Sequence, residues 1–175
     1  MSRWLRLTPI LLLALVLAAL VWRLANPEDT AVKSAMIGQP VPDLLLQSAV
    51  PSKSGWRLRS ENCGPVVINF FASCCAPCIA EARMLEELKG QGVPIVGIAV
   101  RDRPGDVAGF LARNGDPYEA IGADPQSKVQ IAFGASGVPE TFIVDPYCII
   151  RHQHIGPIAP GDVARIRTQW ESLRK

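Results

Sequence analysis

Four residues, Cys75-Ala76-Pro77-Cys78, constrain this chain more than any other stretch. The apolar run Val66–Phe71 leads into them and predicts a strand buried on both faces, because it shows no polar alternation. Apolar residues at helical spacing follow, at Ile79, Ala82, Leu85 and Leu88. Gly90 is placed to end that helix. The two cysteines therefore lie where a strand passes into a helix.

Two cysteines three positions apart at a helix start are close enough to form a disulfide. Cys75 lies beside free backbone N–H groups and the positive end of the helix dipole, which should lower the pKa of its thiol below about 8.5. Pro77 costs little there, because its missing N–H would have no helical partner. The pattern is typical of a redox-active dithiol, in which Cys75 attacks a substrate disulfide and the more buried Cys78 resolves the mixed disulfide.

The N-terminal segment Leu7–Trp22 is apolar except for Thr8. Its length is marginal for a membrane span, which needs roughly 17–25 residues. A retained anchor and a cleaved signal peptide both remain open. The basic residues before the segment favour retention, with the N-terminus in the cytoplasm. Either way, we expect the rest of the chain to be exported.

We therefore divide the chain into a transmembrane anchor or signal-anchor (1–25), a linker (26–37) and one domain (38–175). The formal net charge is +2, from 18 basic and 16 acidic residues. Three of the basic residues, all arginines, lie in or beside the apolar segment, so the remainder is close to neutral. This argues against a nucleic-acid partner, which requires a basic face.

The predicted elements describe an α/β domain. After the dithiol helix we expect a buried strand at Val93–Val100, which completes a right-handed βαβ unit with Val66–Phe71. The other expected strands are Asp43–Gln47, Gly55–Leu58, Thr141–Val144 and Ile149–His154, and the other expected helices are Asp106–Arg113, Ser127–Phe133 and Pro160–Arg174. Such an order predicts a central mixed β-sheet with helices on both faces.

Two motifs resemble the thioredoxin superfamily. One is Phe-Ala-Ser-Cys-Cys-Ala-Pro-Cys after a buried strand, and the other is Gly-Val-Pro-Glu-Thr-Phe at Gly137–Phe142, which resembles its cis-proline loop. With the N-terminal apolar segment, Gly-x-Pro-x-Pro-Asp from Gly38, and Arg151-His152 leading to Gly156-Pro157, the chain resembles the membrane-anchored thiol:disulfide interchange branch of cytochrome c maturation (the CcmG or DsbE type). The resemblance covers roughly residues 36–175 and implies a thioredoxin-like fold.

The resemblance also implies a substrate-binding loop. A cis bond between Val138 and Pro139 would bring the Val138 backbone beside the dithiol, where its polar groups could pair with an extended substrate peptide. Glu140 follows in the same loop, and Glu81 lies one helical turn after Cys78. Either carboxylate could move protons during exchange, and solvated surface positions are the alternative for both.

The chain departs from the family pattern at three positions, one of which is Cys148, in a hairpin turn where the family often has Gly. Thioredoxins generally carry a buried Asp six residues before the first cysteine, and Asn69 stands there in this chain. Asn69 is therefore expected to support the site without acting as a base. Family members usually carry Trp directly before the first cysteine, and this chain has Cys74, which we expect to be unpaired and partly exposed.

The remaining cysteines are Cys63 and Cys148. In a thioredoxin-like sheet, Thr141–Val144 lies antiparallel beside Val66–Phe71, so both cysteines should fall at the end opposite the dithiol. A structural disulfide between them is possible if their Cα atoms lie within about 7 Å. The alternative is that they are two separate small apolar residues at turns.

The leading hypothesis is an enzyme that reduces protein disulfides. The resemblance implies apocytochrome c as substrate, a membrane electron donor of the DsbD type, a single-pass position in the bacterial inner membrane and a periplasmic catalytic domain. No cofactor or metal is expected. The alternatives are a general extracytoplasmic thioredoxin-like reductase and a thiol-based copper metallochaperone or assembly factor, although the latter would favour Cys-x-x-x-Cys with a distant His.

Overall fold

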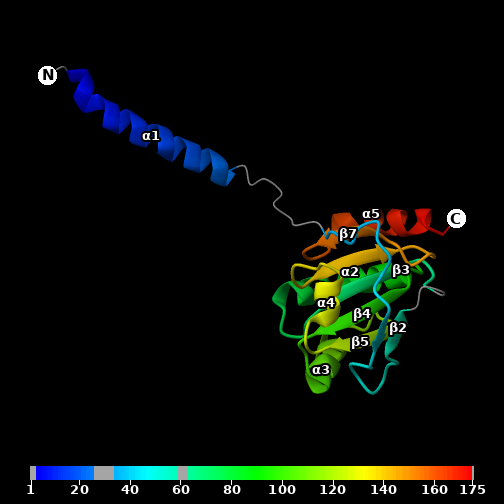
Figure 1. The fold of residues 1–175 in the computed structure, drawn as a ribbon. Coiled ribbons are helices and arrows are strands. Elements are labelled where there is room, and N and C mark those ends of the chain that lie inside the picture. The colour runs from blue at the N-terminus through cyan, green and yellow to red at the C-terminus, as the bar shows by residue number, and fades with distance from the viewer. Residues whose placement is uncertain (1–2, 26–33, 59–62, 175) are drawn as a thin grey trace. The chain divides into compact units, whose positions relative to one another are not determined.

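The computed structural model describes residues 3–25, 34–58 and 63–174. They form two compact units, an N-terminal helix and an α/β domain (Figure 1). Of the linker expected at 26–37, residues 26–33 lie outside the described residues.

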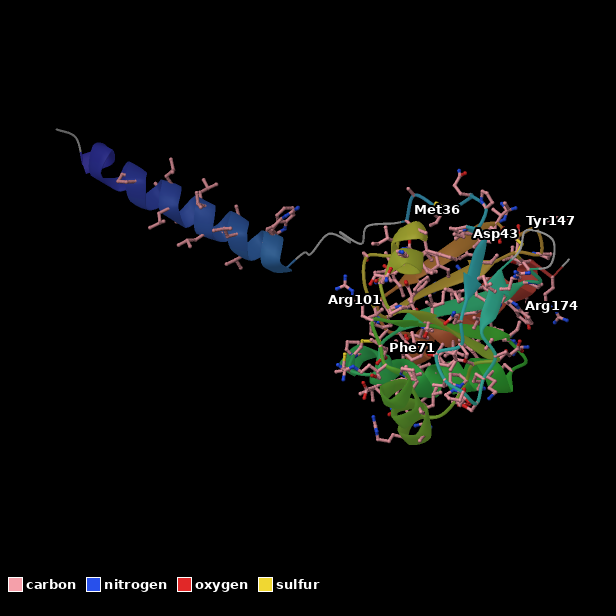
Figure 2. All side chains as sticks on the ribbon, turned by 60° about the horizontal axis from the view of Figure 1, so that its bottom comes forward. Met36, Asp43, Phe71, Arg101, Tyr147 and Arg174 are labelled. Atoms are coloured by element: carbon pink, nitrogen blue, oxygen red, sulfur yellow. A yellow bond between two sulfur atoms is a disulfide. The ribbon has the colours of Figure 1, made fainter. Side chains whose placement is uncertain are left out.

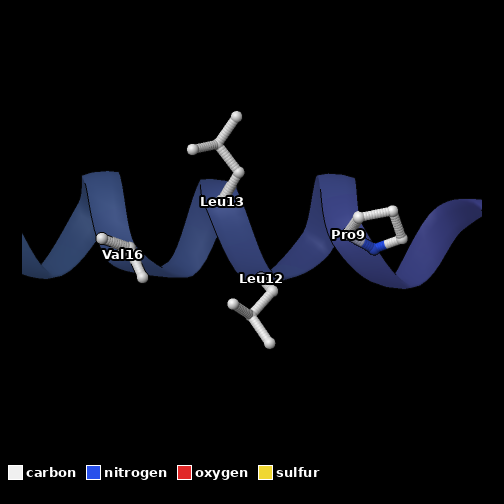
Figure 3. A pocket seen from close by; sticks show the side chains of 4 residues that line it. All are labelled: Pro9, Leu12, Leu13 and Val16. Atoms are coloured by element: carbon white, nitrogen blue, oxygen red, sulfur yellow. The ribbon is translucent and has the colours of Figure 1, made fainter.

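The N-terminal helix is α1 (Arg3–Ala25), which includes Pro9. Pro9 and three apolar residues that follow it line a shallow hollow along the helix: Leu12, Leu13 and Val16 (Figure 3). Among the described residues, no helix meets the length and apolarity needed to cross a membrane. The anchor expected at 1–25 is therefore not confirmed.

The domain is built on a five-stranded sheet with strand order β5-β4-β3-β6-β7. The central strand β3 (Val66–Phe71) runs parallel to β4 (Ile95–Val100) and antiparallel to β6 (Glu140–Val144). The edges are β5 (Ala120–Asp124), parallel to β4, and β7 (Ile150–Ile155), antiparallel to β6. The expected mixed sheet and the antiparallel pairing of β3 with β6 are confirmed.

Two apolar cores lie on the two faces of the sheet, because successive side chains of β3 point in opposite directions. Val67 and Phe71 belong to the core covered by α2 (Ala76–Gly90), α3 (Pro104–Asn114) and α5 (Pro160–Ser172). Ile68 and Phe70 belong to the other core, which includes residues of α4 (Lys128–Ala132), β1 (Leu44–Leu46) and β2 (Trp56–Leu58). Helices on both faces are thus confirmed.

Strand β5 was not predicted from the sequence. Its residues, Ala-Ile-Gly-Ala-Asp, include types that are depleted in strands. The strand forms because β4 offers a parallel partner along its whole length. Gly122 is also required there, because a Cβ atom at this position would lie 2.7 Å from the Cβ of Leu46 in β1.

The ends of the central strands fix where a site can form. Phe70, near the end of β3, pairs with Glu140, the first residue of β6. The start of α2 and the loop before β6 therefore meet at one end of the sheet. Arg101, just after β4, lies on the opposite side of the domain from Tyr147, just after β6 (Figure 2).

Candidate active site

The dithiol lies at the start of α2, where the sequence predicted it. Cys75 is the N-cap residue of the helix, and the Cys78 backbone N–H donates to Cys75 Sγ at 3.2 Å. Cys75 is half-buried, whereas Cys78 is 1% exposed. The two form a disulfide with their Cα atoms 5.2 Å apart. The helix start therefore directs a hydrogen bond and its dipole at the more accessible sulfur.

The loop before β6 lies against this sulfur. The peptide bond between Val138 and Pro139 is cis, and Cys75 Sγ lies 3.6 Å from the Val138 carbonyl oxygen. Pro139 is buried and Val138 is half-buried. The structure thus brings Cys75 and the loop together, as expected from the motif at Gly137–Phe142.

Glu81 is fully buried one turn after Cys78. Its Oε1 accepts a hydrogen bond from Asn69 Nδ2 at 2.9 Å, and its Oε2 accepts one from the Ile158 backbone N–H at 2.9 Å. Burial raises the pKa of Glu81 from 4.5 to about 7, and these two hydrogen bonds oppose the shift. The exposed position proposed as the alternative for Glu81 is wrong, and the dithiol helix itself carries a buried carboxyl group whose pKa is raised to about 7.

Asn69 connects Glu81 to two further side chains. Its Nδ2 also donates to Thr141 Oγ1 at 3.0 Å, and its Oδ1 accepts from the Tyr118 hydroxyl at 2.8 Å. All four side chains are buried. Sequence reasoning missed Tyr118, because no local pattern connects the turn before β5 with β3.

Glu140 is also fully buried, so the exposed alternative is wrong for this residue too. Its Oε1 accepts from the Ser136 hydroxyl at 2.6 Å, and both carboxylate oxygens lie 3.2 Å from the Ser136 backbone nitrogen, whose N–H they accept. From the first position of β6, the Glu140 side chain therefore closes the preceding loop around Pro139.

The turn that carries Cys74 is held in place by the loop that follows β4. Asp102, in the loop after that strand, accepts the Ser73 backbone N–H at 2.6 Å and the Ser73 hydroxyl at 2.7 Å. Cys74 is exposed and has no disulfide partner, as expected.

The structure joins Cys63 and Cys148 in a disulfide, with their Cα atoms 5.2 Å apart. Cys63 precedes β3 and Cys148 follows β6, so both lie at the sheet end away from Cys75. Within the ranges that the structure describes, no group of three His, Cys, Asp or Glu side chains is placed to hold a metal ion.

Comparison of the chain with known proteins shows its family. The AhpC/TSA family model matches residues 37–153. The chain belongs to the AhpC/TSA family. It is 38% identical to the thiol:disulfide interchange protein DsbE homolog of Paracoccus denitrificans, over 81% of this chain and 78% of that protein. It is 32% identical to DsbE of Escherichia coli, over 100% and 98%, and 33% identical to HelX of Rhodobacter capsulatus, over 94% of each chain.

Solved structures show the same fold. A DsbE-type protein of Chlorobium tepidum superposes with a TM-score of 0.69 at 22% identity, over 79% of this chain and 98% of that one. A secreted Mycobacterium tuberculosis disulfide oxidoreductase gives a TM-score of 0.63 at 18% identity, over 75% and 96%. This member of the AhpC/TSA family is a thiol:disulfide oxidoreductase of the DsbE type, and the resemblance carried by its motifs is confirmed.

Proposed function

We propose that this oxidoreductase reduces disulfides in exported proteins, with apocytochrome c during cytochrome c maturation as its leading substrate. The observation that carries the proposal is the setting of Cys75 Sγ, between the Cys78 N–H at 3.2 Å and the Val138 carbonyl at 3.6 Å. The first contact stabilises a thiolate, and the second marks where a substrate backbone would lie. The cytochrome assignment is supported by the resemblance of the motifs and by similarity to DsbE and HelX.

The reaction begins with the reduced protein. The Cys75 thiolate attacks one sulfur of the substrate disulfide, forms a mixed disulfide and releases the other substrate sulfur as a thiolate. Cys78 then attacks Cys75 Sγ, which forms the Cys75–Cys78 disulfide and releases the second substrate thiolate. Two electrons pass from the protein to the substrate, and the product state of the protein is the oxidised one described above.

Glu81 is proposed as the proton acceptor for Cys78 in the second step. Cys78 is buried and must lose its proton before it attacks. A carboxyl group whose pKa is about 7 is suited to accept and return a proton near neutral pH. Asn69 supports this role through its hydrogen bond to Glu81.

The loop before β6 is proposed to hold the substrate backbone. The Val138 carbonyl faces Cys75, so an extended peptide could pair with it while its cysteine approaches the nucleophile. Because this pairing uses main-chain groups, it depends little on the side chains of the substrate peptide. Glu140 would keep this loop in place through its bonds to Ser136.

Location and partners complete the proposal. We place the enzyme in the bacterial inner membrane, held by the apolar segment Leu7–Trp22, with the catalytic domain in the periplasm. A reductase in an oxidising compartment must be reduced again, which implies a membrane electron donor of the DsbD type. Carbonate extraction of membranes from cells that express the full chain tests the anchor: retention in the pellet supports it, and release into the supernatant contradicts it.

The reductase proposal is tested with the reduced protein and an oxidised Cys-x-x-Cys-His peptide, and insulin serves as a general substrate. We expect faster reduction of the peptide, and loss of turnover in Cys75→Ser and Cys78→Ser variants. Equal rates on both substrates would favour a general reductase. Binding of copper without reduction of either substrate would favour a metallochaperone.

A further inference from the structure

We infer that Tyr118 is a positioning residue whose hydroxyl fixes the Asn69 side-chain amide with its N–H groups toward Glu81. Its effect on ionisation of Glu81 stands on the geometry of the buried cluster. Its effect on exchange rests on the proposed function of Glu81.

The cluster has one consistent direction of hydrogen bonding. The Tyr118 hydroxyl donates to Asn69 Oδ1 at 2.8 Å. The opposite end of the same amide donates to Glu81 Oε1 at 2.9 Å and to Thr141 Oγ1 at 3.0 Å. No member is more than 1% exposed, so water does not replace a lost partner easily.

A side-chain amide has an acceptor end and a donor end, so turning it around exchanges the two. If Asn69 turned, its oxygen would face the Glu81 carboxylate and the Tyr118 hydroxyl proton would lose its acceptor. The turned amide suits only a protonated Glu81, whose O–H could donate to the amide oxygen. The Tyr118 hydroxyl therefore favours the amide orientation that stabilises ionised Glu81.

The Tyr118 ring is held firmly in this position. It stacks on Phe71, with ring centroids 5.0 Å apart and planes inclined by 14°. It also fills the space above Gly97 in β4, where a Cβ atom would lie 3.0 Å from the ring. A side chain at position 97 would displace the ring, so the glycine is part of the arrangement.

The titratable groups that face the cluster come from α2 and from the turn before β5. On α2 these groups are Glu81 and Glu86, whereas Cys78 is joined to Cys75 in the oxidised protein and does not titrate. The Ile158 contact to Glu81 is an uncharged backbone N–H. Burial and the nearby negative charges of Glu81, Asp116 and Glu86 raise the pKa of Tyr118 well above 10. The hydroxyl therefore remains a donor throughout the range in which Glu81 ionises.

The decisive variant is Tyr118→Phe, which keeps the ring and removes the hydroxyl. Its matched control is Tyr147→Phe, at an exposed tyrosine in the turn after β6 (Figure 2). The ionisation midpoint of Glu81 is measured in the oxidised protein by NMR of ¹³C-labelled glutamate carboxyls, with Glu81→Gln assigning the signal. We expect the midpoint to rise by about half to one pH unit in Tyr118→Phe and to stay unchanged in the control. An unchanged or lower midpoint in Tyr118→Phe would overturn the inference.

A second measurement uses the wild-type protein and does not depend on the variant folding. Because the two residues share one amide, the ¹³Cζ resonance of Tyr118 should shift with the same midpoint as the Glu81 carboxyl. A Tyr118 resonance that does not respond to Glu81 would also overturn the inference.

The rate of exchange separates this inference from the proposed function. If Glu81 accepts the proton of Cys78, the pH profile of peptide reduction by Tyr118→Phe should move upward with the carboxyl midpoint. A carboxyl midpoint that moves while the rate profile stays in place supports the positioning by Tyr118 and contradicts the proton role of Glu81.

Discussion

The Asn69 side-chain amide donates a 2.9 Å hydrogen bond to the carboxylate of Glu81, which joins the central strand β3 to the helix that carries the dithiol. In the thioredoxin pattern, the strand position carries the carboxylate. In this chain the carboxylate comes from α2 and the strand supplies the donor. The site therefore still contains a buried acid. This acid lies on α2, the helix that carries Cys78, and not on the central strand.

Glu81→Gln should change how stability depends on pH. Because the folded-state pKa of Glu81 is raised from 4.5 to about 7, the folded protein holds this proton more tightly than the unfolded chain. The associated stability is fully present below pH 4.5 and is lost as pH rises through about 7, at most about 3 kcal/mol. In urea unfolding of the oxidised protein, Glu81→Gln should lose less stability than wild type between pH 5 and pH 8. The control is Glu87→Gln, on the exposed side of α2, whose stability should depend on pH as that of the wild type does. If the stability of all three proteins depends on pH in the same way, the expectation is contradicted.

Asn69→Asp should create a pair of carboxyl groups that cannot both ionise. The substitution replaces a donor 2.9 Å from Glu81 with a second acid, so the pair would share one proton at pH 5 and repel at pH 8. We expect its loss of unfolding free energy to be larger at pH 8 than at pH 5 by about 1–3 kcal/mol. Asn114→Asp is the control, because Asn114 donates to the Phe110 carbonyl rather than to a carboxylate. An Asn69→Asp loss that is the same at both pH values would show that the two groups do not interact.

Removal of the bridge between Cys63 and Cys148 should destabilise the domain strongly. The bridged residues are 85 positions apart, which corresponds to roughly 4–5 kcal/mol in the chain-entropy account. Cys148 has φ 62°, a left-handed conformation that glycine adopts without strain. Cys63→Ala/Cys148→Gly should therefore be more stable than Cys63→Ala/Cys148→Ala by about 1 kcal/mol. Urea titration checks both differences, and a total loss below about 1 kcal/mol would show that the bridge contributes little to stability.

The oxidised protein should expose a single thiol. Cys74 is the one free cysteine in the described part of the chain, and it is exposed. Alkylation under denaturing, non-reducing conditions should add one label to the wild type and none to Cys74→Ser. Three labels on the wild type would mean that Cys63 and Cys148 are not joined in solution.

Much of the fold could be predicted because its strongest signals are local. The apolar run Val66–Phe71, the helical spacing after it and the motif at Gly137–Phe142 each determine one element. Pairing β3 with β6 then brings Cys63 and Cys148 to the same end of the sheet, so even a contact across 85 positions could be proposed from topology, although topology alone left two separate residues as the alternative. Strand β5 was missed because its stability comes from its neighbour β4 and not from its own residues.

The interior of the site could be predicted only in part. A glutamate one turn after Cys78 looks the same in sequence whether it faces solvent or the sheet. Its burial depends on α5 and the loop at Ile158 closing over α2, which no local pattern reports. Tyr118 reaches Asn69 only because β5 lies beside β4 and Gly97 leaves space for the ring.

The most direct test of the account is to trap the mixed disulfide. Reduced Cys78→Ser protein is mixed with an oxidised Cys-x-x-Cys-His peptide, and the adduct is mapped by mass spectrometry under non-reducing conditions. We expect one peptide per protein, linked to Cys75, with the same adduct in Cys74→Ser/Cys78→Ser and none in Cys75→Ser/Cys78→Ser. A peptide linked to Cys74, or the absence of any adduct, would contradict the assignment of Cys75 as the nucleophile of a disulfide reductase.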